Sequence, residues 1–135
     1  MRVAVEICVD SVQSAVAAQA GGAQRVELCD NLMEGGTTPS FGSIEVARKL
    51  LDIKLHIIIR PRGGDFLYSD TEFKIMKRDI EAAKGLGVDG VVIGLLDREG
   101  NIDVTRTAEL VERSRPMTVT FHRAFDVCVD PFKAI

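Results

Sequence analysis

Residues 3–29, VAVEICVDSVQSAVAAQAGGAQRVELC, contain two short apolar segments separated by a longer helical pattern. The apolar segments, Val3–Cys8 and Arg25–Cys29, are predicted strands. Asp10-Ser11 can cap a helix that runs to the glycine pair Gly21-Gly22, which can adopt the left-handed conformation that ends many helices. A strand, a helix and a second strand in this order predict a βαβ unit with parallel strands.

The same alternation continues along the rest of the chain. Three further strands are predicted, at Leu55–Arg60, Gly90–Gly94 and Thr118–His122. Helices are expected from about Ser43 to Leu51, from the capping pair Ser69 and Glu72 to near Gly85, from Asp103 to just before Pro116, and from Asp130-Pro131 onward.

This succession of equally spaced units favours an α/β fold of the TIM-like (β/α) barrel type. A complete barrel usually needs eight units and about 250 residues, whereas this chain has 135. We therefore expect a single domain over residues 1–135 that holds about the first four and a half units, an incomplete barrel truncated at its C-terminus. An open, doubly wound sheet is the alternative.

Composition limits the classes of function. Hydrophobic residues make up 46% of the chain. The 17 Lys and Arg against 20 Asp and Glu give a net charge of -3, so the chain lacks the basic excess that is typical of nucleic-acid-binding proteins. The three cysteines indicate free thiols in a reducing compartment, so a cytoplasmic location is expected. Neither a signal peptide after Met1-Arg2 nor an apolar stretch long enough to cross a membrane is expected.

Alternation of side chains along the predicted strands places an unusual polar set on the face that would line the barrel. The third strand has apolar residues on both faces and allows either orientation. If its Leu55, Ile57 and Ile59 face the helices, the set comprises Glu6, Cys8, Glu27, Cys29, His56, Arg60 and His122. Barrel interiors are mostly Val, Ile and Leu, and barrel enzymes build their sites at the C-terminal ends of strands, so the set indicates a functional site. A network in which glutamates and arginines neutralise one another is the structural alternative.

The cysteines of this set could hold a metal ion. Soft thiolates select copper(I), zinc or iron–sulfur clusters, and two thiols alone favour copper. Neighbouring strands lie about 4.8 Å apart, close to the separation of about 4.6 Å that a linear dithiolate needs. Alternatively, Cys8 and Cys29 pack as small buried hydrophobes. Cys128 has no partner at a matching spacing, and we assign it no role.

Two glycine-containing loops could approach a ligand closely. They are GGTTPS at residues 35–40 and RPRGGDF at residues 60–66. The arginines of the second loop suit a carboxylate or phosphate. In the alternative, Arg62 and Asp65 tie that loop to itself.

Taken together, the motifs of this sequence closely resemble the CutC family of copper homeostasis proteins. The matching segments are VEICVDS (5–11), GGA (21–23), RVELC (25–29), GGTTPS (35–40), residues 60–70 and TFHRAFD (120–126). The resemblance covers essentially the whole chain but only the N-terminal half, or somewhat more, of a family member, whose fold is a complete TIM-like barrel. It implies a cytosolic protein, with a nuclear presence also compatible, that forms homo-oligomers and binds copper(I) through Cys8 and Cys29.

Three hypotheses follow. The leading one is a copper(I)-binding protein of copper homeostasis, with His56 or His122 as outer ligands. The second is a TIM-barrel enzyme acting on a small anionic metabolite, which leaves open whether the protein is an enzyme at all. In the third, the unpaired edges of the short sheet recruit a partner chain.

The enzyme hypothesis assigns a role to each polar residue. Arg60, Arg62, Asp65 and His56 would bind the anion, and Glu6, Glu27 and His122 would be the acid–base candidates. Because an incomplete barrel lacks opposing strands, we also expect Glu6, Glu27 and Arg60 to be more exposed to water than in a closed barrel.

Overall fold

The computed structural model describes residues 3–135. Met1 and Arg2, which begin the segment used above to exclude a signal peptide, lie outside the described residues. The elements in chain order are β1 (Glu6–Val9), α1 (Val12–Ala20), β2 (Arg25–Leu28), η1 (Leu32–Glu34), α2 (Phe41–Leu50), β3 (Lys54–Ile58), α3 (Asp70–Gly85), β4 (Gly90–Ile93), α4 (Val104–Ser114), β5 (Thr118–Phe121) and η2 (Arg123–Val127).

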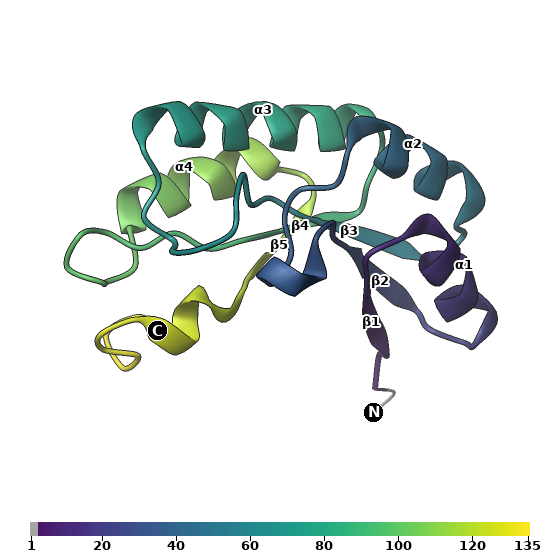
Figure 1. The fold of residues 1–135 in the computed structure, drawn as a ribbon, viewed down its shortest axis with the longest axis horizontal. Coiled ribbons are helices and arrows are strands. Elements are labelled where there is room, and N and C mark those ends of the chain that lie inside the picture. Colours follow the sequence, from purple (N-terminus) through teal and green to yellow (C-terminus); the bar gives the residue numbers. More distant parts are fainter. Residues whose placement is uncertain (1–2) are drawn as a thin grey trace.

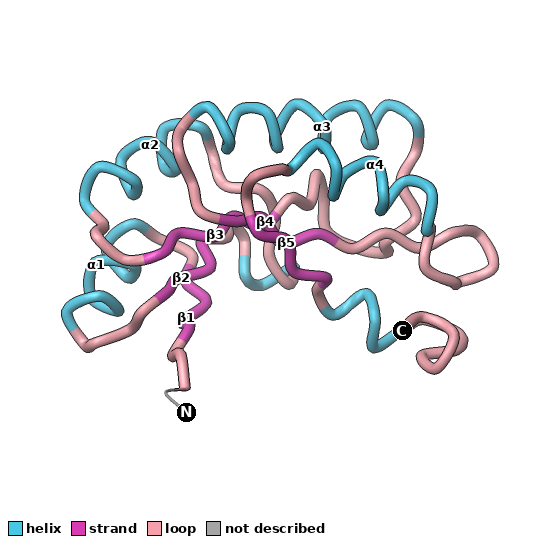
Figure 2. Tube along the Cα trace, turned by 180° about the vertical axis from the view of Figure 1, so that it is seen from behind, coloured by secondary structure: helices cyan, strands magenta, loops and turns pink. Residues whose placement is uncertain are grey.

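The five strands form one parallel sheet in the order β1-β2-β3-β4-β5. The helices that connect them all cover the same face of this sheet, and the opposite face is left without helices (Figures 1 and 2). A doubly wound sheet has helices on both faces and a point at which strand order reverses. The arrangement is instead that of an arc of a (β/α) barrel, as predicted.

The core lies between the sheet and the helices. Alternate residues of β3 and the segment after it, Leu55, Ile57 and Ile59, are fully buried there, together with Met76 and Ile80 of α3. Burial of each such side chain stabilises the fold by about 1.5–3 kcal/mol. Because successive side chains of a strand point to opposite faces, this packing fixes His56, Ile58 and Arg60 on the helix-free face.

The helix starts follow the local hydrogen-bonding residues. Ser69 accepts from the backbone N–H of Glu72, whose side chain accepts from the backbone N–H of Ser69, so the predicted capping box is present. Asp103 caps α4 as predicted. Helix α2 begins at Phe41, earlier than expected, because the Ser40 hydroxyl caps it by accepting a hydrogen bond from the backbone N–H of Ser43.

The chain after β5 differs from the expectation. No helix begins at Asp130-Pro131: the Asp130 carboxylate accepts from the N–H groups of Phe132 and Lys133, but only a turn follows. Instead, a 3-10 helix starts directly after β5, at Arg123, where the side chain of His122 caps it. The earlier helix was missed because its cap is a histidine rather than Ser, Thr, Asp or Asn.

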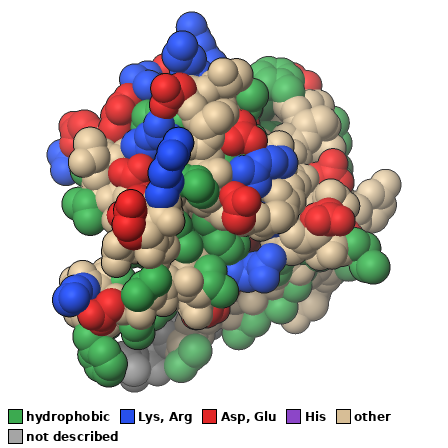
Figure 3. All heavy atoms as spheres, turned by 60° about the vertical axis from the view of Figure 1, so that its left-hand side comes forward, with side chains coloured by type: hydrophobic (Ala, Val, Ile, Leu, Met, Phe, Trp, Pro, Cys, Tyr) green, Lys and Arg blue, Asp and Glu red, His purple; other side chains and the backbone are tan. Residues whose placement is uncertain are grey.

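The surface carries both signs of charge. On the face shown in Figure 3, Lys and Arg side chains lie interspersed with Asp and Glu. Within residues 3–135, no helix has the length and apolar character needed to span a membrane.

Candidate functional site

Part of the polar set on the helix-free face, Cys8, Glu27 and Cys29, lies together at one end of the sheet. The register pairs Cys8 with Glu27. Cys29 lies two residues after Glu27, just beyond the end of β2, and on the same face. The backbone N–H of Cys29 donates to the carbonyl of Val9, which keeps the two chains together beyond the last strand pair. Sequence alternation therefore correctly placed the two thiols and the carboxyl group on one side.

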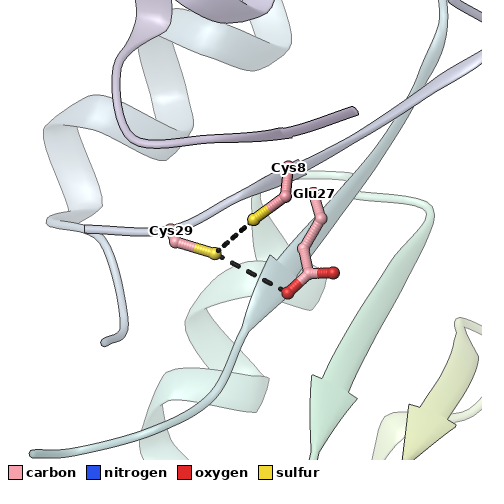
Figure 4. Close-up of side chains that lie close together, drawn as sticks. All are labelled: Cys8, Glu27 and Cys29. Carbon is pink, nitrogen blue, oxygen red and sulfur yellow. Dashed lines mark hydrogen bonds between the residues drawn. The ribbon is translucent and has the colours of Figure 1, made fainter. Parts of the chain in front are cut away.

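These three side chains are in direct contact (Figure 4). The Sγ atoms of Cys8 and Cys29 lie 3.5 Å apart, and the Cys29 Sγ lies 3.6 Å from Oε1 of Glu27. One ligand atom from each residue falls within 4.8 Å of the others, so the cluster could hold a single metal ion. Glu27 was considered above for acid–base chemistry, and its place among the candidate metal-binding atoms was not predicted.

Burial favours the protonated forms of the donor groups of this cluster. It raises the pKa of the Cys8 thiol, with the nearby carboxylates of Glu27 and Glu6 acting in the same direction. The pKa of Cys29 is raised strongly, again mainly by burial. Burial and the negative charge of Glu6 also raise the pKa of Glu27. A cation in the cluster would therefore displace protons.

The distance between the two sulfurs favours a bent over a linear arrangement around a bound metal ion. Two thiolates bound to one ion at about 2.3 Å would stand about 4.6 Å apart if linear and about 4.0 Å apart if trigonal. The observed 3.5 Å between the sulfurs of Cys8 and Cys29 is nearer the trigonal value, and Glu27 offers the third donor atom. The linear dithiolate expected from strand spacing would need the sulfurs to separate by about 1 Å.

A cavity of about 300 Å³ opens beside the cluster. Its walls include Cys8 and Glu27 on one side and Arg60, His122 and Arg123 on the other. Arg60 is 1% exposed, so the expectation that it would be exposed to water is wrong. Backbone carbonyls of the neighbouring loops surround its guanidinium group.

The two histidines predicted as outer ligands occupy different places. His122 lines the cavity. His56 lies lower in the sheet, where its Nε2 is 3.2 Å from the Thr118 hydroxyl. Neither belongs to the group of ligand atoms around Cys8 and Cys29. Burial lowers the pKa of both imidazoles, that of His122 to about 4.

The remaining predicted site residues are engaged with near neighbours. Glu6 pairs with Arg25, its register partner on β2. Arg62 forms ion pairs with Asp65 and Glu72. Thus Arg62 and Asp65 adopt the self-tied loop described above as an alternative, and neither lines the cavity beside the cysteines.

Arg123 is a cavity residue to which sequence analysis gave no role. Its guanidinium lies against Gly35: a Cβ at that position would be 2.0 Å from Nη2 of Arg123. A usable signal was present in the sequence, because Arg123 directly follows the predicted end of the fifth strand, where barrel sites are built.

Comparison with known proteins gives a consistent picture. The sequence profile of the CutC family matches residues 3–135. A CutC family protein of Chromobacterium violaceum is 60% identical over 131 residues, which are 97% of this chain and 53% of that protein. A human copper homeostasis protein cutC homolog is 53% identical over 131 residues, covering 97% of this chain and 48% of that protein.

The solved structure of CutC from Streptococcus agalactiae superposes with a TM-score of 0.88 at 38% sequence identity. The match covers 94% of this chain and 62% of that one. The chain thus spans about half the length of the curated relatives it matches.

Proposed function

Because the chain belongs to the CutC family, we propose that it binds copper(I) through Cys8 and Cys29 and serves in copper homeostasis. The observation that carries this proposal is the contact between the two sulfurs, which lie 3.5 Å apart, one on β1 and the other directly after the parallel strand β2. Copper homeostasis is the role named for the human and mouse relatives. A cytoplasmic location and assembly into homo-oligomers belong to the same proposal.

The donor set supports copper(I) over harder cations. Thiolates are soft ligands, which bind copper(I) and zinc in preference to hard cations such as magnesium and calcium. Glu27 would complete the coordination as a weaker third ligand, since its carboxylate oxygen is a hard donor. Three protein ligands are also enough for an open zinc site, so zinc is the competitor that an experiment must include.

Binding would couple to proton release. The thiols of Cys8 and Cys29 are protonated near neutral pH because burial raises the pKa of each. A metal ion binds the thiolate form, so each thiol that coordinates must give up its proton to solvent. Glu27 lies where it can accept a hydrogen bond from the Cys29 thiol in the metal-free state.

The test is a competition titration of the reduced chain with copper(I) and a chromogenic chelator of known affinity. We expect one copper ion per chain. The variants Cys8→Ser and Cys29→Ser should each weaken binding by at least about 100-fold, because one soft ligand is replaced by a hydroxyl. Cys128→Ser is the matched control, since Cys128 is a free thiol outside the cluster.

The same titration with zinc gives the second arm. The proposal requires that zinc fail to displace copper(I) at equal concentration. Equal losses of copper in all three cysteine variants would show adventitious thiol binding and overturn the ligand assignment. Zinc that displaced copper would instead make the cluster a zinc site.

A further inference from the structure

Arg60 is a buried cation without a counterion in the part of the chain that the structure describes. Its side chain donates hydrogen bonds to three neutral carbonyls: Nη1 to those of Glu34 at 2.7 Å and Gly36 at 2.8 Å, and Nη2 to that of Gly64 at 2.8 Å. The Nε atom is buried and has no hydrogen-bond partner within residues 3–135. Buried charges are normally paired, so this arginine lacks an anion.

His122 presents a second unused donor to the same cavity. Its Nδ1 accepts a hydrogen bond from the backbone N–H of Ala124 at 3.1 Å. In the neutral imidazole the proton therefore lies on Nε2. That Nε2 atom is buried and finds no partner among the described residues. The His122 side chain lines the cavity, so this donor lies next to it.

Arg123 adds a second positive charge. Its guanidinium lies 5.8 Å from the centre of the Phe66 ring, and that of Arg60 lies 5.0 Å from the same centre. Within residues 3–135, neither arginine is within ion-pair distance of a carboxylate. Gly35, which faces Arg123, has φ +83° and no side chain, so the guanidinium occupies space that any other residue would fill.

Glu27 is the one acidic side chain among the described residues that line the cavity. Its interactions are with other residues. Its carboxyl group contacts Cys29. Arg25 is the arginine that acts to lower its pKa, although burial has the larger, opposite effect. Glu27 therefore does not neutralise Arg60 and Arg123, and the far side of the cavity keeps its excess of donors.

We propose that this cavity binds a small oxyanion, a carboxylate or a phosphate group, held by Arg60, His122 and Arg123. The volume of about 300 Å³ suits a small metabolite rather than a nucleotide or a peptide. Arg60, His122 and Arg123 all line this one cavity, so an anion there would lie beside two positive charges and an imidazole N–H donor. The proposal concerns residues other than the metal ligands and does not depend on copper.

The experiment uses the reduced, metal-free chain and two probes, inorganic phosphate and malonate. Each is titrated calorimetrically, and the imidazole resonances of His122 are followed by NMR. We expect saturable binding at one site with a Kd of about 1 mM or tighter for at least one probe. Phosphate alone would identify a phosphoryl ligand, malonate alone a carboxylate, and both the shared oxyanion chemistry.

Two variants and a control test the assigned donors. Arg123→Gln removes a charge from the exposed side of the cavity. His122→Asn keeps an acceptor for the N–H of Ala124 and removes the Nε2 donor. Each should weaken binding about tenfold, the effect of one charge-assisted hydrogen bond. Arg78→Gln, an exposed arginine on α3, is the matched control and should leave binding within about twofold.

The outcomes decide the proposal without reference to copper. Cys29→Ser, at a residue that does not line the cavity, should retain oxyanion binding even if it abolishes copper binding. Failure of both probes to saturate the folded chain at about 50 mM would overturn the proposal. Equal weakening by Arg123→Gln and Arg78→Gln would overturn it as well, because it would show attraction to net charge rather than a site.

Discussion

The sulfur atoms of Cys8 and Cys29 lie 3.5 Å apart, although the residues are separated by 21 positions and are not register partners. Cys8 lies opposite Glu27, and Cys29 approaches it diagonally where β2 has ended. The contact therefore depends on the parallel pairing of β1 with β2 and on the path of the chain just after Leu28. It connects the first βαβ unit of the sequence to the chemistry proposed for the protein.

Copper affinity should rise with pH. Because burial raises the pKa of both thiols, each releases a proton when it binds the metal. The apparent affinity should increase about 100-fold per pH unit between pH 6.5 and 8 if two protons leave, and about tenfold in Cys8→Ser. Competition titrations at several pH values measure this slope. A wild-type affinity independent of pH would contradict binding by two thiolates.

Glu27→Gln should stabilise the metal-free chain at neutral pH by about 1 kcal/mol. The pKa of Glu27 is raised mainly by burial and further by Glu6, so its charged form disfavours the folded state. A carboxyl group whose pKa is raised by folding destabilises the fold once the pH rises above its pKa in the unfolded chain. The stabilisation by Glu27→Gln should therefore vanish near pH 4. Urea unfolding at both pH values checks this.

The matched control for that variant is Glu99→Gln, on an exposed loop. It should change the unfolding free energy by less than about 0.5 kcal/mol at either pH. The same Glu27→Gln chain should also bind copper(I) more weakly than wild type. A variant that was destabilised at pH 7, with unchanged copper affinity, would remove Glu27 from the account.

His122 should make the chain sensitive to acid. Burial lowers the pKa of this imidazole to about 4 in the folded chain, against about 6.5 when unfolded. An imidazole whose pKa is lowered by folding makes its full contribution to the stability of the fold above about pH 6.5. This contribution is lost as the pH falls toward 4. Between pH 7 and pH 4.5, wild type should lose about 2 kcal/mol more than His122→Asn.

Denaturant unfolding of wild type and His122→Asn in parallel measures that difference. Other groups titrate in both chains and cancel when the two are subtracted. A difference that stays constant from pH 7 to 4.5 would show that His122 is not buried in its neutral form.

Removal of the α3 cap should destabilise the fold without affecting the metal. Ser69→Ala loses the hydroxyl that accepts from the N–H of Glu72 and should cost about 1 kcal/mol. Ser69→Thr keeps a hydroxyl and should recover most of this loss. Thermal unfolding compares the three chains. Equal melting temperatures for Ser69→Ala and Ser69→Thr would contradict a capping role.

Much of this architecture could be predicted from short-range sequence rules. Alternation along residues 25–29 put Glu27 and Cys29 on one face, and the apolar parity of Leu55, Ile57 and Ile59 put His56 and Arg60 on the same side. The structure confirms the five strands in order and the four helices between them, and the family profile confirms the resemblance to the CutC family. These features follow from periodicity, which is local information.

Features that depend on where loops meet could not be predicted in this way. Arg60 was expected to be exposed to water, but its guanidinium is buried and donates hydrogen bonds to the carbonyls of Glu34, Gly36 and Gly64. Those carbonyls come from two different loops, and no pattern near Arg60 indicates them. The approach of the Glu27 carboxylate to Cys29 likewise depends on the path of the chain after β2.

The most direct test of the metal proposal is X-ray absorption at the copper edge of the reduced chain loaded with one equivalent of copper(I). We expect two sulfur scatterers at about 2.3 Å and one lighter scatterer, the carboxylate of Glu27. Cys29→Ser should lose one sulfur, and Cys128→Ser should lose none. A spectrum without sulfur scatterers, or one in which Cys128→Ser alone removes sulfur, would contradict copper(I) binding by Cys8 and Cys29.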